Sequence, residues 1–299
     1  MEEITKVNTA NSKKNKITIF GIVNSTILIV FGLICLFPFL YEILVSFASK
    51  TDYYQSTFIV FPKHFNIESY KYILFQGRIG NALIVSIFVT IAGTFFSMLL
   101  TIIGAYFLSR EDMWGSRIFF YFILITMFFG GGLIPFFITV RNLGLMNSLA
   151  GIIVPFGINT FNMIILRNFF SRVPDSILES CKIDGASQIV MLFRFVVPLS
   201  LAGIATISLF YAVERWNDWY WPMLFITDDS IFPLSLELRN ILSAKQSSGL
   251  GSGSVDSTVT FSEGQNAATI VMAIMPILAV YPFVQKYFVQ GVMLGSVKE

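Results

Sequence analysis

Six long apolar runs divide this chain, and each is long enough to cross a lipid bilayer as a helix. A membrane-spanning helix needs roughly 20 mainly apolar residues, because each residue rises about 1.5 Å and the hydrocarbon core is about 30 Å thick. The sequence therefore predicts an all-α polytopic membrane protein, with one transmembrane domain over residues 19–299 behind an N-terminal tail of residues 1–18. The six runs cover residues 19–47, 82–109, 117–140, 149–170, 195–226 and 268–290.

The composition agrees with a protein dissolved in lipid. Of its 299 residues, 55% are hydrophobic and only 13% are charged, whereas soluble domains carry about 25% charged residues. The net charge of +2 is too small to suggest nucleic-acid binding. The first apolar run exceeds the roughly 7–15 residues of a signal-peptide core and shows no clear cleavage site, so we interpret it as an uncleaved span.

The distribution of Lys and Arg residues predicts the orientation of the spans. Cytoplasmic loops of membrane proteins carry an excess of these residues. With the N-terminus inside, twelve of the 20 Lys and Arg residues lie in cytoplasmic segments, seven lie outside, and Arg215 falls within a span. We therefore expect a multi-pass protein of the cell membrane with both termini and residues 171–194 in the cytoplasm.

The sequence lacks the residue patterns of an enzyme or of a metal site. It contains no G-x-S-x-G, H-E-x-x-H or G-x-x-x-x-G-K-[ST] motif. Cys35 and Cys181 lie far apart and His64 is the single histidine, which argues against a disulfide and against a metal. The Gly- and Ser-rich residues 247–254 resemble a linker more than a phosphate-binding loop, because no strand precedes them. We expect no cofactor in this chain.

One short polar segment lies between the fourth and fifth apolar runs. Residues 179–187 read Glu-Ser-Cys-Lys-Ile-Asp-Gly-Ala-Ser. Pro174 and Asp175 are signals for a helix start, and Gly185 is a stop signal because glycine accepts the left-handed conformation. A second helix is expected to begin near residues 186–187. Physical grounds alone leave two interpretations, a helix on the membrane surface and a rigid helix that enters a groove on a cytoplasmic protein.

This segment resembles the coupling motif of ABC importer permeases, which is Glu-Ala-Ala, three residues, Gly, nine residues, an aliphatic residue, one residue and Leu-Pro. Glu179, Gly185 and Pro198 fall at matching positions. Small or apolar residues replace the other motif positions, namely Ser180, Cys181, Phe195 and Val197. The resemblance implies a cytoplasmic coupling helix between spans four and five that docks a partner ATPase through Glu179, Ser180, Cys181, Asp184, Gly185 and Ala186.

Further segments are similar to the carbohydrate-uptake branch of this family, and specifically to its maltose-type second permeases. They are Met-Phe-Phe-Gly-Gly-Gly-Leu-Ile-Pro at 127–135, Asn-Leu-Gly-Leu at 142–145, Trp-Asn-Asp-Trp at 216–219 with Pro222, and the chain ending at 286–298. The ending and the long loop before the last span look most like permeases proposed to import oligosaccharides or polysaccharide fragments.

The resemblance implies a sugar importer of several subunits. This chain would pair with a second homologous permease, two cytoplasmic ATPase subunits would bind ATP and Mg, and an external binding protein would deliver the sugar. Two alternatives remain open: a permease for a non-sugar solute such as a peptide or phosphonate, and a membrane sensor or scaffold that does not transport.

Polar and aromatic residues near the end of the fifth run are candidates for the transport path. Charges within a membrane span indicate function by default, and ligand pockets combine apolar walls with a few placed polar groups. The alternative is an aromatic belt at the outer membrane interface. Gly130–Gly132 and Pro135 interrupt the third run, either to shape the path or to allow close helix packing. The candidate path residues are Glu214, Trp216, Asn217, Trp219, Tyr220 and, in the fourth run, Asn162.

Overall fold

The computed structural model describes residues 19–56, 58–59, 61–76, 78–110, 112–248 and 262–296. Over these residues the regular structure is entirely helical. The predicted N-terminal tail and most of the predicted Gly- and Ser-rich linker lie outside the described residues.

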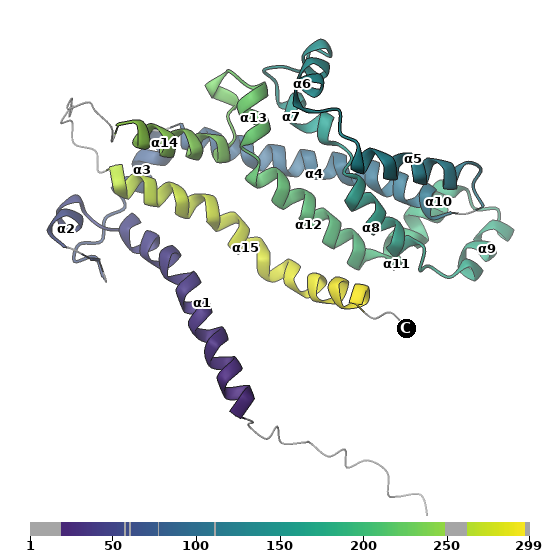
Figure 1. Cartoon of the computed structure of the whole chain (residues 1–299), viewed down its shortest axis with the longest axis horizontal. Helices are drawn as coiled ribbons and strands as arrows, with labels where there is room; N and C mark the ends of the chain where they lie inside the picture. The colour runs from purple at the N-terminus through teal and green to yellow at the C-terminus, as the bar shows by residue number, and fades with distance from the viewer. Residues whose placement is uncertain are drawn as a thin grey trace, which may run out of the picture.

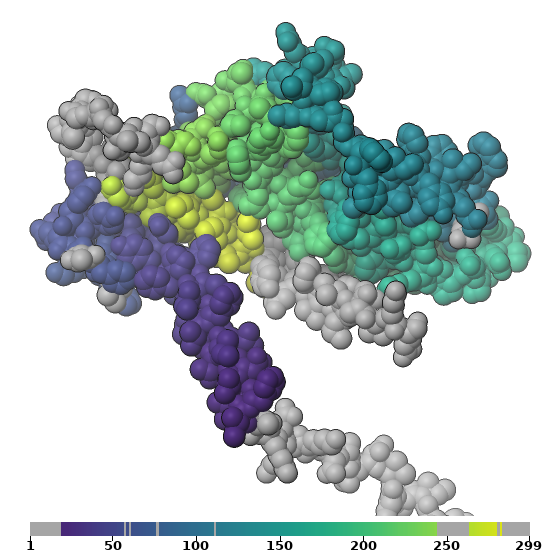
Figure 2. Space-filling view, viewed as in Figure 1, coloured from purple at the N-terminus to yellow at the C-terminus, as the bar shows by residue number. Residues whose placement is uncertain are grey.

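Two uninterrupted helices match the first and second apolar runs. α1 (Ile19–Ser46) and α4 (Ile79–Ser109) are each long and apolar enough to cross a membrane alone. In its most apolar stretch α1 buries 0% of its residues against the protein, and its N-terminal part projects away from the main body in Figure 2. Its apolar circumference suits contact with lipid. The corresponding stretch of α4 is 33% buried, because α4 runs through the middle of the helix bundle (Figure 1).

The third predicted run is two helices instead of one. α5 (Ser116–Phe128) and α6 (Leu133–Asn142) meet at an angle of 114°. The cause is local, because Gly132 caps α6 with a φ of +84°, in a region that residues with a side chain rarely adopt. The span predicted over 117–140 is therefore not a straight helix.

The fourth and fifth predicted runs are also bent. α7 (Leu149–Ile153) continues as the 3-10 turn η2 (Val154–Phe156) and meets α8 (Thr160–Phe170) at 50°. The helical segment of residues 188–199 meets α12 (Leu201–Asn217) at 87°. Pro155 and Pro198 lie next to these breaks, and each lacks the N–H that a continuous helix needs. Counted with each bent pair as one span, α1, α4 and the three pairs give up to five crossings among the described residues.

Several of the shorter elements lie at the two ends of the molecule (Figure 1). One end holds α2 (Lys50–Gln55), α3 (Glu68–Lys71), the π-turn η1 (Tyr72–Gln76) and α14 (Leu234–Ser248). The opposite end holds α9 (Asp175–Ile183), α10 (Gln188–Met191), the π-turn η3 (Leu192–Val196) and α11 (Val197–Leu199). α13 (Tyr220–Phe225) and the 3-10 turn η4 (Asp229–Ile231) follow α12. α15 (Ser262–Ser296) packs along α1 and covers the sixth predicted run.

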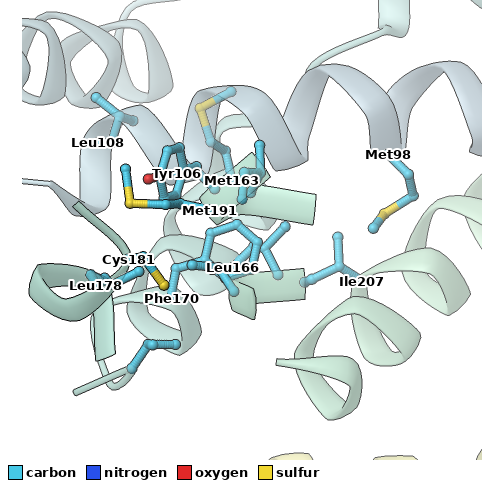
Figure 3. Close-up of a cluster of buried hydrophobic side chains, with 14 of the residues drawn as sticks. Met98, Tyr106, Leu108, Met163, Leu166, Phe170, Leu178, Cys181, Met191 and Ile207 are labelled. Atoms are coloured by element: carbon cyan, nitrogen blue, oxygen red, sulfur yellow. The ribbon is translucent and has the colours of Figure 1, made fainter. Parts of the chain in front are cut away.

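The largest buried cluster lies between α4, α8 and α12 and extends to α9 and α10. Its side chains interlock in Figure 3, where Tyr106 of α4, Phe170 of α8 and Met191 of α10 converge from three helices. The cluster joins the central bundle to the end of the molecule that carries α9. Because protein interiors are close-packed, a displacement of α9 would disturb its side-chain packing against α4 and α8.

Candidate functional site

A cavity of about 560 Å³ opens beside the breaks of the third and fourth spans. Three parts of the chain line it: the glycine break with the start of α6, the break between η2 and α8, and the end of α12 with the start of α13. The lining residues are Gly130, Gly131, Gly132, Leu133, Phe136, Pro155, Phe156, Ile158, Asn159, Glu214, Tyr220 and Trp221.

One wall of the cavity is a cluster of aromatic rings. The ring centroids of Phe136 and Phe156 are 5.5 Å apart, those of Phe136 and Trp221 5.0 Å, and those of Phe156 and Trp221 5.1 Å. These rings come from α6, η2 and α13, so they tie the three parts of the lining together. Polar side-chain groups are few, namely those of Asn159, Glu214 and Tyr220 and the indole N–H of Trp221. An apolar wall with a few polar groups is the usual make-up of a small-molecule site.

The glycines of the third-span break leave open space at the cavity. A Cβ atom added at Gly130 or Gly131 would meet nothing within 4 Å. Glycines that allow two helices to pack closely would show near neighbours at that position. The structure therefore favours the first of the two interpretations of this motif, in which the glycines shape a path.

The backbone at the fourth-span break is held by two side chains of α12. The hydroxyl of Tyr211 accepts a hydrogen bond from the Asn159 amide at 3.0 Å and shares a 2.8 Å hydrogen bond with Thr101 of α4. Arg215, one helical turn further on, donates to the carbonyl oxygens of Ile152 at 3.1 Å and of Phe156. The sequence shows Arg215 as a charge within a predicted span but does not indicate its role.

Two of the six predicted path residues line the cavity, Glu214 and Tyr220. Glu214 is exposed and makes no ion pair with any residue that the structure describes. A carboxylate on a membrane-spanning helix without a cation partner needs water, a ligand or another subunit to satisfy it. Its position suits a hydrogen-bond acceptor for a bound solute.

The other four predicted path residues lie outside the cavity. Trp216 donates its Nε1–H to the Ala273 carbonyl of α15 at 3.0 Å, and the Asn217 side-chain amide donates to the carbonyl of Val213 at 2.8 Å. The guanidinium carbon of Arg239 lies 4.2 Å from the ring centroid of Trp219. Asn162 is buried within α8, with 3% of its surface exposed. Their place on a transport path stays a prediction.

Most of the cavity wall could not be predicted from the sequence. Asn159 carries a local signal, because an Asn before an apolar run is a helix N-cap, and its Oδ1 accepts from the Asn162 amide at 3.2 Å. A cap at that point would have located the fourth-span break. Phe136, Phe156 and Trp221 carry no such signal, since aromatic residues are frequent throughout this chain.

The predicted coupling segment is a helix with the expected ends. α9 covers Asp175–Ile183, and Gly185 has a φ of +76°. Its inner face packs into the core, because Leu178 is 1% and Cys181 is 6% exposed, both directed toward Phe170 (Figure 3). Ser187 caps α10, as expected for the second helix.

The outer face of α9 carries Glu179, Ser180 and Asp184, which are exposed, and Ile183, which is 87% exposed. Of the six predicted ATPase contacts, Cys181 is buried in the core and Ala186 is partly buried against it. All six roles stay predictions that rest on the motif.

Ion pairs connect α9 to the loop between α4 and α5. Lys182 donates to the carboxylate of Asp112, and Arg110 donates to Asp175 at 3.3 Å. Arg110 also lies 3.6 Å from Asp112 and is only 11% exposed in its side chain. The hydrogen bond from Lys182 lowers the pKa of Asp112 below its ordinary value of 3.8. α9 is thus attached to the α4–α5 loop as well as to the core.

Metal ligands are not gathered at either region. Among the described residues, no group of three or more His, Cys, Asp or Glu side chains is arranged to hold a metal ion. That this chain binds no cofactor stays a prediction.

Two proteins similar to this chain are named for the sugars that they transport. The chain is 43% identical over 276 residues to the polygalacturonan/rhamnogalacturonan transport system permease protein YtcP of Bacillus subtilis. The aligned region covers 91% of this chain and 95% of the relative. It is 26% identical to the arabinooligosaccharides transport system permease protein AraQ of Bacillus subtilis, over 79% of this chain and 80% of the relative.

A solved structure shares the fold. It is the crystal structure of a bacterial ABC transporter involved in the import of the acidic polysaccharide alginate, with a TM-score of 0.83 and 33% sequence identity. The match covers 92% of this chain and 98% of that one. No family model matches the chain.

Proposed function

The chain belongs to the permease subunits of carbohydrate ABC importers, and from this premise we propose that it moves an oligosaccharide into the cell through the cavity at its span breaks. The observation that carries the route is the cavity itself. It lies where the two breaks leave backbone N–H and C=O groups without hydrogen-bond partners in their own helix. Irregular backbone at membrane depth is tolerated where it is buried in protein or lines a water-filled space.

The chemistry of the cavity supports a sugar as its occupant. Sugar rings present apolar faces and many hydroxyl groups. The aromatic wall offers flat apolar surface to such faces, and the carboxylate of Glu214 accepts hydrogen bonds from hydroxyls. The side chains of Asn159 and Tyr220 donate and accept on the same lining.

The two alternatives have weaker support. A permease for a peptide or phosphonate would be expected to resemble permeases of those solutes, whereas the relatives named above are carbohydrate permeases. A sensor or scaffold that does not transport would need neither the cavity nor the coupling motif. Co-purification with an ATPase subunit from membranes distinguishes the scaffold from the importer.

In the proposed assembly the chain crosses the membrane six times, with α15 as the sixth span and with both termini and α9 in the cytoplasm. Its partners are a second homologous permease, two ATPase subunits that bind ATP and Mg, and an extracytoplasmic sugar-binding protein. The outer surface of α9 docks one ATPase. The excess of Lys and Arg on the proposed inner side supports this orientation.

The orientation is tested by cysteine labelling of a variant with Leu250→Cys, after Cys35 and Cys181 are replaced by Ser. A membrane-impermeant maleimide added to intact cells is expected to label position 250. Labelling only after the cells are opened would contradict the proposed topology.

The route is tested with the complex of both permeases, the ATPases and the binding protein in lipid vesicles. Tyr220→Ala and Glu214→Gln are expected to lower the stimulation of ATP hydrolysis by a panel of oligosaccharides. Tyr121→Ala on α5 is the matched control, because Tyr121 is 56% exposed and lies outside the cavity lining. Unchanged stimulation in both cavity variants would remove the cavity from the route.

A further inference from the structure

Arg215 is an arginine in the membrane interior that binds backbone instead of a carboxylate. It is 5% exposed. Its Nη1 donates to the Ile152 carbonyl at 3.1 Å, and its Nη2 donates to the Phe156 carbonyl and, at 3.4 Å, to Ser97 Oγ. Its guanidinium carbon also lies 5.4 Å from the Phe156 ring centroid. Within the described part of the chain, no Asp or Glu lies within ion-pair distance of it.

The two carbonyls need an outside donor because of the local sequence. Pro155 has no N–H, so in a 3-10 turn the Ile152 carbonyl, three residues earlier, receives no hydrogen bond from it. Phe156 ends the turn, and the last carbonyls of a helix have no partner within that helix. Water is scarce at membrane depth, so these oxygens must be satisfied by protein. A cation also suits the partial negative charge of a helix C-terminus.

Tyr211 does the same on the other side of the break. It lies four residues before Arg215, hence on the same face of α12. Its hydroxyl accepts from the amide of Asn159, the residue that precedes α8. One face of α12 therefore holds the carbonyl end of η2 through Arg215 and the start of α8 through Tyr211.

This attachment fixes part of the cavity wall. Pro155, Phe156 and Asn159 line the cavity, and each belongs to the backbone that Arg215 or Tyr211 holds. Glu214, the neighbour of Arg215 in the chain, lines the same cavity. A displacement of the guanidinium would therefore shift the aromatic wall relative to Glu214.

We propose that Arg215 is a positioning residue for transport, which sets the shape of the sugar cavity by holding the broken fourth span against α12. The proposal rests on the proposed sugar route. A planar guanidinium can bridge two carbonyls with separate nitrogens, whereas a lysine ammonium is a point charge on a flexible stem. The identity of the residue matters here, and not only its charge.

The test compares Arg215→Lys with the wild type in the reconstituted importer, with oligosaccharide-stimulated over basal ATP hydrolysis as the readout. Arg215→Lys is expected to assemble with its partners and keep basal hydrolysis, but to lose about tenfold or more of the stimulation, the scale on which misplaced binding groups act. Arg141→Lys, at an exposed arginine of α6, is the matched control and should behave as the wild type.

A second variant approaches the same contact from α4. A Cβ atom at Gly93 would lie 3.2 Å from Arg215 Nε, so Gly93→Ala displaces the guanidinium slightly and leaves its charge in place. We expect a loss of stimulation in the same direction but smaller. Gly32→Ala on α1 is the control, because nothing lies within 4 Å of that position.

The outcomes separate this inference from the proposed function. If the wild-type complex responds to oligosaccharides and Arg215→Lys responds equally, the inference alone is overturned. If Arg215→Lys fails to assemble, Arg215 is a folding residue and the inference is again overturned. If the wild-type complex responds to no glycan, the proposed function fails and takes the inference with it.

Discussion

At the cavity, polar side chains of α12 hold the backbone of a broken span, whereas α9 is held by apolar side chains and exposed ion pairs. Tyr211 and Arg215 are 1% and 5% exposed. By contrast, the side chains of Lys182 and Asp112, which join α9 to the α4–α5 loop, are 42% and 46% exposed. The buried contacts have no substitute within the membrane, but water can replace the exposed ones.

This difference predicts how each region responds to change. In the cavity, single polar side chains should govern sugar recognition. At α9, the apolar anchors and the backbone conformation at Gly185 should govern ATPase docking, and the surface charges should matter least. The following variants test that ordering.

The largest effect is expected at the apolar anchor of α9. Leu178 is 1% exposed, and truncation of a buried leucine to alanine costs about 2–5 kcal/mol. Leu178→Ala should loosen α9 and strongly reduce the ATPase that co-purifies with the detergent-solubilised permease. Leu199→Ala, at a leucine that is 58% exposed, should have little effect. Equal losses in the two variants would show that the anchor is not what holds α9.

A smaller effect is expected from the backbone at the end of α9. A residue with a side chain is strained by roughly 1–2 kcal/mol in the left-handed conformation, which Gly185 adopts with a φ of +76°. A Cβ atom there meets nothing within 4 Å in this chain. The effect of Gly185→Val should therefore come from backbone strain or from crowding of the ATPase, and not from a clash within this chain. Docking should weaken while the spans remain inserted. Full docking and full uptake would reduce α9 to a surface helix.

Loss of the Tyr211 hydroxyl should have a moderate effect at the cavity. Tyr211→Phe removes the acceptor for the Asn159 amide, and hydrogen bonds between membrane helices contribute about 0.6 kcal/mol on average and up to about 1.7 kcal/mol. Oligosaccharide stimulation should fall and ATPase docking should not. Tyr121→Phe, at an exposed tyrosine of α5, is the control. Reduced ATPase docking in Tyr211→Phe would contradict the distinction between the cavity and α9.

The smallest effect is expected at the exposed ion pair. Surface pairs contribute about 0–1 kcal/mol, so Asp112→Asn should reduce docking less than Gly185→Val does. The pKa of Asp112 is lowered, so its contribution is present above the ordinary pKa of an Asp and is lost as pH falls through the lowered value. The difference between wild type and variant should therefore stay constant from about pH 5 to 8. A difference that changes within that interval would assign the effect to another group.

Local signals predicted α9 well and the cavity only in part. Pro174, Gly185 and Ser187 act on their own stretch of backbone, so both ends of α9 and the start of α10 could be predicted from the sequence. Gly130–Gly132 likewise indicated an interruption of the third span. The fourth-span break also has local signals in Pro155 and Asn159, but the donors and the acceptor that hold it come from α12, about 50 to 60 residues away.

The path residues show the same limit. Trp216 and Tyr220 are near neighbours in the sequence with similar chemistry, yet one packs on α15 and the other lines the cavity. α12 ends at Asn217 and α13 begins at Tyr220, so the direction of each side chain depends on where the helix stops. The run predicted over 195–226 was treated as continuous, although Asp218, whose Oδ1 accepts from the Trp221 amide, is a residue type that starts helices.

The central claim is that sugar recognition and ATPase docking lie in separate regions of this one chain. It is tested most directly by measuring co-purified ATPase and oligosaccharide-stimulated hydrolysis for Tyr220→Ala and Gly185→Val in the same complex. The account predicts that Tyr220→Ala keeps its ATPase subunits but loses stimulation, and that Gly185→Val co-purifies with less ATPase than the wild type. The same pattern of loss in both variants would contradict it.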